Sequence, residues 1–128
     1  MSANQENKAL VRRFLKAVEG GDIAVIEQLQ SADCRWWILG RGWISKDSYV
    51  EGIRTMLLAA DPRTIEITGI IAEDGVVAAE IRSSFGFGER VYENAYHDIF
   101  VIRDGVIVEG KEYFDTGKVA AFFGDLSK

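Results

Sequence analysis

The sequence predicts an α+β fold in which helices cover one face of a strongly curved, mostly antiparallel sheet. The first observation is a change of period: apolar residues recur mostly at helical spacing before Arg63 and alternate at strand spacing after it. The second is a pair of Asp-Gly turns, Asp74-Gly75 and Asp104-Gly105, each flanked by β-branched residues. Because Asp-Gly tolerates the positive φ angles of a two-residue turn, both sites predict antiparallel hairpins.

Three helices are expected before the main strands. The first, Gln5 to Glu19, places its apolar residues at helical spacing and ends at a pair of glycines. Asp22 is a good N-cap for a second, short helix at Ile23 to Gln28, and Ser45 caps a third helix at Lys46 to Ala59. The simplest interpretation of these helices is a layer packed on a sheet.

One early strand is expected between the second and third helices, at Asp33 to Leu39, and Gly40-Arg41-Gly42 is expected to break it. Adjacent Trp36 and Trp37 must point to opposite faces of this strand, so that one can line a cavity while the other packs elsewhere. The later part of the chain is expected to form strands at Thr64 to Glu73 and Val76 to Phe87, a loop at Glu89 to Glu93, the two arms of the hairpin around Asp104-Gly105, and a last short helical or irregular segment at Lys118 to Phe123.

Composition indicates one domain, residues 1–128, whose hydrophobic content of 48 % is enough for a core without disulfides or metals. The single Cys34 cannot form an intrachain bridge, which fits a reducing compartment, and the amino-terminal segment lacks the features of a signal peptide. The formal net charge of −5 argues against nucleic acid and anionic membrane as partners. We therefore expect a cytoplasmic protein with no nucleic-acid and no membrane partner.

Most of the chemically useful side chains lie in one hairpin, from Asn94 to Thr116. With a two-residue turn, Arg103 pairs with Val106 and the register follows by counting outward. The expected cross-strand pairs are His97–Glu112, Tyr96–Tyr113, Asp98–Lys111 and Asn94–Asp115. In that regular ladder His97 and Asp115 lie on opposite faces. A β-bulge, for which Gly110 is a plausible place, would bring them to a common face, and the sequence leaves both arrangements open.

Nearly the whole chain is covered by three segments, in the order LVRRFLKAVEGGDIAVIEQL, YENAYHDIFVIRDGVIVEGKEYFDT and VAAFFG. Together they resemble the NTF2-like (cystatin-like α+β cone) superfamily, and in particular its SnoaL-like group, which is related to ketosteroid isomerases. The resemblance implies one cone-shaped domain, with three N-terminal helices in the concave side of the sheet and a pocket between them. It does not fix the function, because the superfamily includes isomerases, polyketide cyclases, epoxide hydrolases, dehydratases and association domains.

The resemblance implies a catalytic role for Asp115, which matches the late-strand aspartate that serves as general acid/base in the cyclases. A carboxylate at the mouth of an apolar cone suits a general base. The alternative is that Asp115 only caps the segment that follows it. Tyr96, Tyr113 or His97 is expected to donate the hydrogen bond that stabilises an enolate. For His97, the alternative is a structural pair with Glu112.

The expected ligand is a small apolar molecule inside the cone. The residues expected to bind it are Trp37, Tyr49, Arg82, Phe100, Glu112 and Tyr113. Arg82 falls where the epoxide hydrolases carry an Arg and an Asp two residues apart, but Ser84 stands in the place of the acid, which disfavours epoxide hydrolysis. One His, one Cys and scattered carboxylates form no recognisable metal-ligand set, and no cofactor-binding motif is present, so no metal and no cofactor are expected.

The sequence favours a small cofactor-independent enzyme of isomerase or cyclase type, with lyase or hydrolase chemistry less favoured. It would transfer a proton on an apolar, carbonyl-bearing or polyketide-like molecule. The alternatives are a non-catalytic domain that binds a small ligand and an association module. The long strands carry apolar residues on both faces, so that covering one face with helices leaves apolar surface on the other. This predicts a homodimer through the outer face of the sheet.

Overall fold

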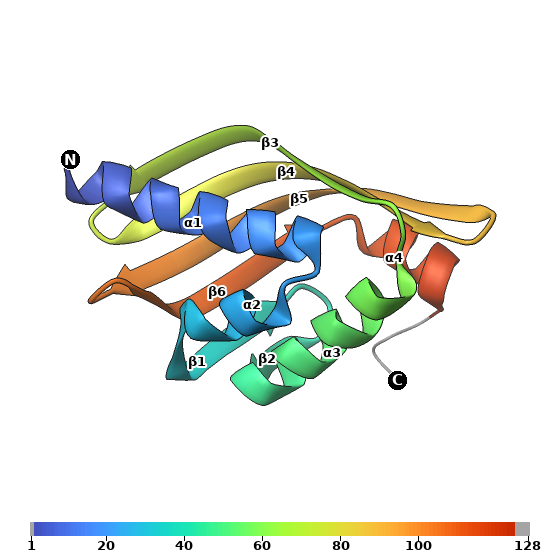
Figure 1. Ribbon diagram of the computed structural model, residues 1–128, viewed down its shortest axis with the longest axis horizontal. Helices are drawn as coiled ribbons and strands as arrows, with labels where there is room; N and C mark the ends of the chain where they lie inside the picture. The colour runs from blue at the N-terminus through green and yellow to red at the C-terminus, as the bar shows by residue number, and fades with distance from the viewer. Residues whose placement is uncertain (1, 125–128) are drawn as a thin grey trace.

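The computed structural model describes residues 2–124 and confirms the α+β class (Figure 1). A six-stranded sheet has the order β2-β1-β6-β5-β4-β3, and every neighbouring pair is antiparallel except the parallel pair of β1 and β6. The predicted domain limits, residues 1 and 128, lie outside the described residues. The elements are α1 (Ala3–Gly20), α2 (Ile23–Gln28), β1 (Gln30–Ile38), β2 (Gly42–Ser45), α3 (Lys46–Ala59), β3 (Arg63–Glu73), β4 (Val76–Phe87), β5 (Arg90–Arg103), β6 (Val106–Phe114) and α4 (Thr116–Phe123).

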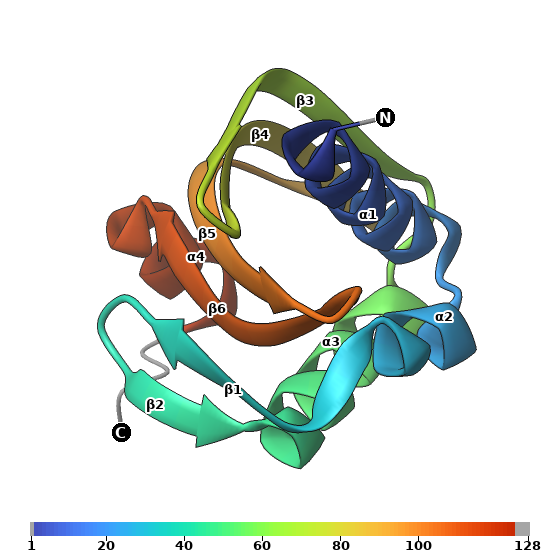
Figure 2. The same cartoon turned by 90° about the vertical axis from the view of Figure 1, so that its left-hand side faces the viewer.

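The sheet curves strongly, and α1, α2 and α3 lie on its concave side (Figure 2). Helix α1 contacts β3 and β4, whereas α2 and α3 contact β1. Helix α4 follows the end of β6 and contacts β5. The interior of the molecule therefore lies between three helices and the inward-facing residues of the sheet, as predicted for an NTF2-like cone.

Helices α2 and α3 begin and end at the predicted residues, whereas α1 and α4 each begin two residues earlier than predicted, at Ala3 and Thr116. The Asp22 carboxylate accepts a hydrogen bond from the Val25 amide over 3.3 Å, and the Ser45 hydroxyl accepts one from the Ser48 amide over 3.1 Å. These caps fix the starts of α2 and α3, which have the predicted bounds. Gly21 ends α1 with a φ of 71°, a conformation that glycine adopts without strain. No helix within residues 2–124 is long and apolar enough to cross a membrane.

The segment Gly40-Arg41-Gly42 breaks the early strand as predicted, since β1 ends at Ile38. Gly40 and Gly42 have φ angles of 83° and 97°, and the chain turns back so that a further strand that was not predicted, β2, pairs with β1. One local prediction about the sheet is wrong. The predicted loop at Glu89 to Glu93 belongs to β5 from Arg90 onward, because the chain turns at Gly88-Glu89 and Arg90 pairs with Phe87. In both places a glycine with positive φ makes the turn tighter than the sequence pattern suggests.

The register of β5 and β6 differs from the prediction by one residue. The two-residue turn is confirmed, since Arg103 pairs with Val106, and Ile102 then pairs with Ile107. The next pair, however, is Val101 with Glu109, so that Val108 is an extra residue in a β-bulge. Beyond the bulge, His97 pairs with Tyr113, Asp98 with Glu112 and Tyr96 with Phe114. The predicted pairs His97–Glu112, Tyr96–Tyr113 and Asp98–Lys111 are therefore wrong.

Packing explains the bulge. Ile107 and Gly110 are both buried although they are three residues apart, which a regular alternation of faces does not allow. The Trp36 ring lies directly over Gly110: a Cβ atom at position 110 would lie 2.2 Å from the ring atom Cζ3. Only glycine can occupy this position without moving the ring. The bulge, predicted near Gly110, therefore lies two residues before it and turns Gly110 inward.

Trp36 is the centre of the aromatic core. Its ring is fully buried and stacks on Tyr49, with 3.9 Å between ring centroids and an interplanar angle of 5°. Phe14 and Phe100 pack on it at centroid distances of 5.7 and 5.9 Å. The indole Nε1 donates a hydrogen bond to Gln30 Oε1 over 2.9 Å, so the polar atom of the ring is satisfied inside the core.

Candidate active site

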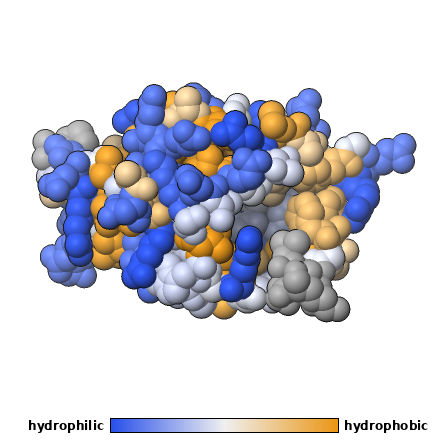
Figure 3. All heavy atoms as spheres, turned by 90° about the horizontal axis from the view of Figure 1, so that it is seen from below, coloured by the Kyte–Doolittle hydropathy of each residue, from blue (hydrophilic) through white to orange (hydrophobic). Residues whose placement is uncertain are grey.

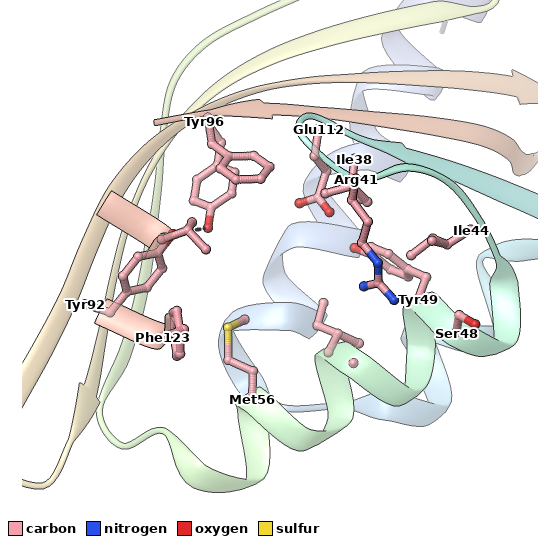
Figure 4. A pocket seen from close by; sticks show the side chains of 14 residues that line it. Ile38, Arg41, Ile44, Ser48, Tyr49, Met56, Tyr92, Tyr96, Glu112 and Phe123 are labelled. Carbon is pink, nitrogen blue, oxygen red and sulfur yellow. Dashed lines mark hydrogen bonds between the residues drawn. The ribbon is translucent and has the colours of Figure 1, made fainter. Parts of the chain in front are cut away.

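A cavity lies between α3 and the inward faces of the sheet, at the end of the molecule where α4 begins. Its outer compartment measures about 220 Å³. Tyr92, Tyr96 and Phe123 lie on one side of it, and Glu112 and Tyr49 lie across from them (Figure 4). The rest of the wall is mainly apolar and includes Ile38, Ile44, Ile53, Met56, Phe114 and Val119. Seen from below, the surface is hollowed between apolar side chains (Figure 3).

A smaller inner compartment of about 60 Å³ lies deeper, against α1, β3 and β4. The two compartments are adjacent, since five residues line both of them: Tyr49, Ile53, Met56, Tyr96 and Glu112. The inner compartment is lined largely by apolar side chains of α1 and β4, together with the polar side chains of Ser83 and Asp98. An apolar pocket with a few convergent polar groups is the usual form of a small-molecule site.

Asp98 and Glu112 form a pair of carboxyl groups in this cavity. They are directly opposite each other on β5 and β6, and the Asp98 side chain is buried with only 5 % exposure of the residue. Among the described residues, Asp98 Oδ1 has no hydrogen-bond partner. The pair exists because the Val108 bulge places Glu112, and not Lys111, opposite Asp98.

Burial changes the protonation of this pair. Desolvation raises the pKa of Asp98 well above its ordinary value, the nearby Glu112 charge raises it further, and the backbone amide of Tyr113 opposes the shift. Desolvation also raises the pKa of Glu112, to about 7. Two carboxylates that face each other in a buried site repel each other, so ionising both at once is costly. Both shifts favour the protonated form, and the pKa of Glu112 lies close to neutral pH.

A chain of hydrogen bonds runs along β5 to the cavity. The Asn94 amide donates to the Tyr92 hydroxyl over 2.8 Å, and the hydroxyls of Tyr92 and Tyr96 are 2.7 Å apart. When Tyr92 accepts from Asn94 and donates to Tyr96, the Tyr96 proton is free to point into the cavity. Burial raises the pKa of Tyr96 above its ordinary value, so this hydroxyl stays protonated and can donate.

The expectation that Asp115 faces the pocket is wrong. Asp115 is exposed and is the N-cap of α4, where its carboxylate accepts a hydrogen bond from the Lys118 amide over 3.2 Å. This is the alternative capping role that the sequence leaves open. Its backbone is held from inside the cone, since the Asn94 side chain donates to Asp115 O and accepts from Asp115 N. His97 is also exposed, on the outer face, opposite Tyr113.

The remaining predicted site residues divide between the two faces of the sheet. The structure places Tyr49, Tyr96 and Glu112 in the wall of the cavity. Trp37 and Tyr113 pack against each other on the outer face, with ring centroids 5.2 Å apart, and Arg82 is exposed there as well. Phe100 is fully buried in the aromatic core behind Trp36. The shift of one residue in β6 and the orientation of the two tryptophans decide these placements.

Sequence reasoning missed several residues of the cavity. Asp98 is predicted as an ion-pair partner of Lys111, and Arg41 only as part of a strand-breaking segment, yet both line the cavity. Tyr92 and Ser83, which line the outer and the inner compartment, are missed as well. The signal that could have revealed Asp98 and Glu112 is the spacing of Ile107 and Gly110, since a glycine on the inward face next to a tryptophan strand requires the bulge. Within residues 2–124 no group of three His, Cys, Asp or Glu side chains could hold a metal ion.

Comparison with known proteins gives both a family and a fold. The SnoaL-like domain family matches residues 11–110. Among solved structures, AclR from Streptomyces galilaeus is 20 % identical with a TM-score of 0.85, over 97 % of this chain and 99 % of its own. An LEH-like epoxide hydrolase from M. tuberculosis is 21 % identical with a TM-score of 0.81, over 98 % and 92 % of the two chains.

A third similar structure is IdmH from Streptomyces antibioticus, a proposed polyketide cyclase, which is 15 % identical with a TM-score of 0.78 over 92 % of this chain and 98 % of its own. At these identities the likeness establishes the fold and not the reaction. A search of curated proteins finds no significant match.

Proposed function

The chain belongs to the SnoaL-like domain family, and we propose that it is a small cofactor-independent enzyme of isomerase or cyclase type. It would transfer a proton on an apolar, carbonyl-bearing or polyketide-like molecule held in the cavity. The observation that carries the proposal is the Asp98–Glu112 pair, two facing carboxyl groups with raised pKa values in a mainly apolar cavity. The free, buried Cys34 supports a reducing compartment such as the cytoplasm.

The proposed reaction starts from a ketone bound beside Tyr96. The Tyr96 hydroxyl donates a hydrogen bond to the carbonyl oxygen, and the Glu112 carboxylate removes a proton from the adjacent carbon. The C–H bond breaks, its electron pair moves into the enolate, and the proton forms an O–H bond on Glu112. When the enolate is conjugated with a double bond, return of that proton to the far carbon of the conjugated system gives an isomer. Attack of the enolate on a second carbonyl of the same molecule forms a C–C bond and an alkoxide, which takes the proton from Glu112 and gives a cyclised alcohol. Asp98 stays protonated and keeps the pair from carrying two negative charges.

Related structures support this class of chemistry. An epoxide hydrolase and a proposed polyketide cyclase share the fold, so the fold is compatible with enzymes that act on small molecules. The proposal rests on the carboxyl pair of this chain, however, because one fold supports several reactions.

The test uses a simple ketone with acidic α-protons, 2-tetralone, in D₂O. The protein is expected to accelerate the exchange of the α-protons for deuterium, followed by NMR, well above the rate in the same buffer. Binding is measured separately by thermal stabilisation, since a ligand at 100 times its Kd stabilises the folded protein by about 2.7 kcal/mol. Stabilisation by 2-tetralone without any acceleration of exchange would favour the alternative, a non-catalytic domain that binds small ligands.

Replacement of Tyr96 by Phe is expected to lower the exchange rate about 10²-fold, because it removes the donor to the developing enolate oxygen. The tyrosine at position 113 provides a matched control, since its side chain packs on Trp37 on the outer face of the sheet. Tyr113→Phe should leave the rate within twofold of the wild type. A Tyr96→Phe variant with the wild-type exchange rate would contradict the role of this hydroxyl.

We also propose that the protein is a homodimer through the outer face of the sheet. Apolar side chains lie next to one another there: Ile71 pairs with Ala78, which pairs with Ile99, and Val76 pairs with Val101 on the same side. Ile71 is 69 % exposed and Val76 is 38 % exposed. Contiguous apolar surface of this kind usually marks an interface, and a second copy of the chain carries the same surface.

Sedimentation at micromolar concentration is expected to show a dimer, and Ile71→Lys should shift it toward the monomer. Leu58→Lys is the matched control, because Leu58 is also highly exposed, at 79 %, but lies on α3 and not on the sheet. Sedimentation of the wild-type chain as a monomer would overturn the proposed dimer.

A further inference from the structure

Ser83 has a polar atom inside the cavity that the proposed reaction does not use. Its residue exposure is 6 %, and among the described residues its hydroxyl oxygen has no hydrogen-bond partner. It lines the inner compartment together with Ile81 and Phe85 of the same strand and Ile65 of β3. Buried hydroxyl groups in folded proteins are nearly always hydrogen-bonded, so this one is available to a polar group that enters the compartment.

The position of Ser83 relative to the carboxyl pair limits what that group can be. Ser83 pairs with Asn94 across β4 and β5, whereas Asp98 lies four residues further along β5, roughly 13 Å at the usual strand rise. Ile81 and Tyr96, which also pair with each other, lie between these two ends. The inner compartment therefore has the Asp98 and Glu112 carboxyl groups toward one end and the Ser83 hydroxyl toward the other, with Ile81 and Tyr96 between them.

The size of the inner compartment also limits the group that can enter it. A volume of about 60 Å³ is small beside the outer compartment of about 220 Å³. One water molecule needs roughly 10–15 Å³ of such space, so the inner end holds a few water molecules or one small part of a larger ligand. The body of a ligand has its room in the outer compartment and at the junction beside Tyr96 and Glu112.

We propose that Ser83 is a specificity-determining residue, and that the inner compartment binds a hydroxyl or carbonyl oxygen at the far end of a ligand whose reacting carbonyl lies beside Tyr96. The substrate class is then a compact apolar ring compound that carries an oxygen at each end. This inference rests on the proposed function for the orientation of the ligand. The inference adds a second polar contact, from Ser83, to the proposed function. This contact would let the protein distinguish ligands that carry an oxygen at the far end from ligands that do not.

The test compares two probes that differ by one hydroxyl, 2-tetralone and 6-hydroxy-2-tetralone. In the wild type, 6-hydroxy-2-tetralone is expected to bind about tenfold more tightly, the effect of one hydrogen bond to a buried neutral group. Ser83→Ala should reduce this preference to near one while leaving the binding of 2-tetralone unchanged. Ser84→Ala is the matched control, because residue 84 is the neighbouring serine and points to the opposite face of β4. Unfolding curves of both variants verify that they fold.

Binding and exchange are measured on the same samples, so that the two proposals fail separately. Loss of the preference in Ser83→Ala, with no exchange by any variant, keeps the inner polar subsite and rejects the catalytic proposal. A wild type that binds both probes equally, a Ser83→Ala variant that keeps the preference, or a protein that binds neither probe overturns the role of Ser83.

Discussion

Replacement of Glu112 by Gln is expected to lower the rate of α-proton exchange by about 10²–10⁴-fold while leaving ligand affinity nearly unchanged. Glutamine keeps the shape of the side chain and its contact with the cavity but cannot accept a proton. The exchange rate, followed by NMR in D₂O, and the affinity, from thermal stabilisation, separate the two effects. An unchanged exchange rate in Glu112→Gln would rule out this residue as the base.

The dependence of the rate on pH provides a second measurement on the same variant. The carboxylate form of Glu112 is the base, and burial raises its pKa to about 7, so the wild-type rate should rise with pH through neutrality and level off above it. The small residual rate of Glu112→Gln should lack this step. Histidine side chains in general can produce a similar profile, so His97→Ala is the control. Because His97 is exposed on the outer face, its removal should leave both the rate and the profile unchanged.

Replacement of Trp36 by Ala is expected to lower the free energy of unfolding by about 3–5 kcal/mol. The fully buried ring stacks on Tyr49 and covers Gly110, so its loss opens a cavity in the middle of the aromatic core. It also leaves the buried Gln30 Oε1 without the indole donor. Urea unfolding measures the change, and a shift in the midpoint at constant slope would show that stability alone has changed.

The adjacent tryptophan is the matched control for that experiment. Trp37 is only partly buried and lies on the outer face against Tyr113. Trp37→Ala should therefore cost no more than about 1–2 kcal/mol, since surface-side truncations are much cheaper than core ones. Equal losses for the two variants would contradict the placement of Trp36 at the centre of the core.

The elements of this fold could be predicted because their signals are local. Asp22 and Ser45 cap α2 and α3 by hydrogen bonds that span three residues, and Asp104-Gly105 makes a turn that depends on two residues only. Such signals are complete within a short stretch of sequence. The β1·β2 hairpin was missed because Gly40 and Gly42 are equally compatible with a break and with a turn.

The candidate site could be predicted only in part, because it depends on contacts between distant segments. Which of Trp36 and Trp37 points inward is decided by the space above Gly110, a residue more than seventy positions later. Gly110 indicates that a bulge could lie nearby, but the sequence does not decide between a bulge and a regular ladder or place the extra residue at Val108, since valine suits a regular strand equally well. One residue of shift in β6 then placed Glu112 opposite Asp98, whereas His97 faces outward because it alternates with the buried Asp98 along β5.

The bulge at Val108 also gives the carboxyl pair a recognisable spacing along the chain. Five residues separate Asp98 from the Asp-Gly turn, and six residues separate that turn from Glu112. A related chain with one residue fewer at position 108 would have five on each side, and its two acids would face each other without a bulge. A chain with six residues but no bulge would instead place Lys111 opposite Asp98. Counting residues from the turn is therefore a way to find this acid pair in other sequences, where similarity of the surrounding residues would not reveal it.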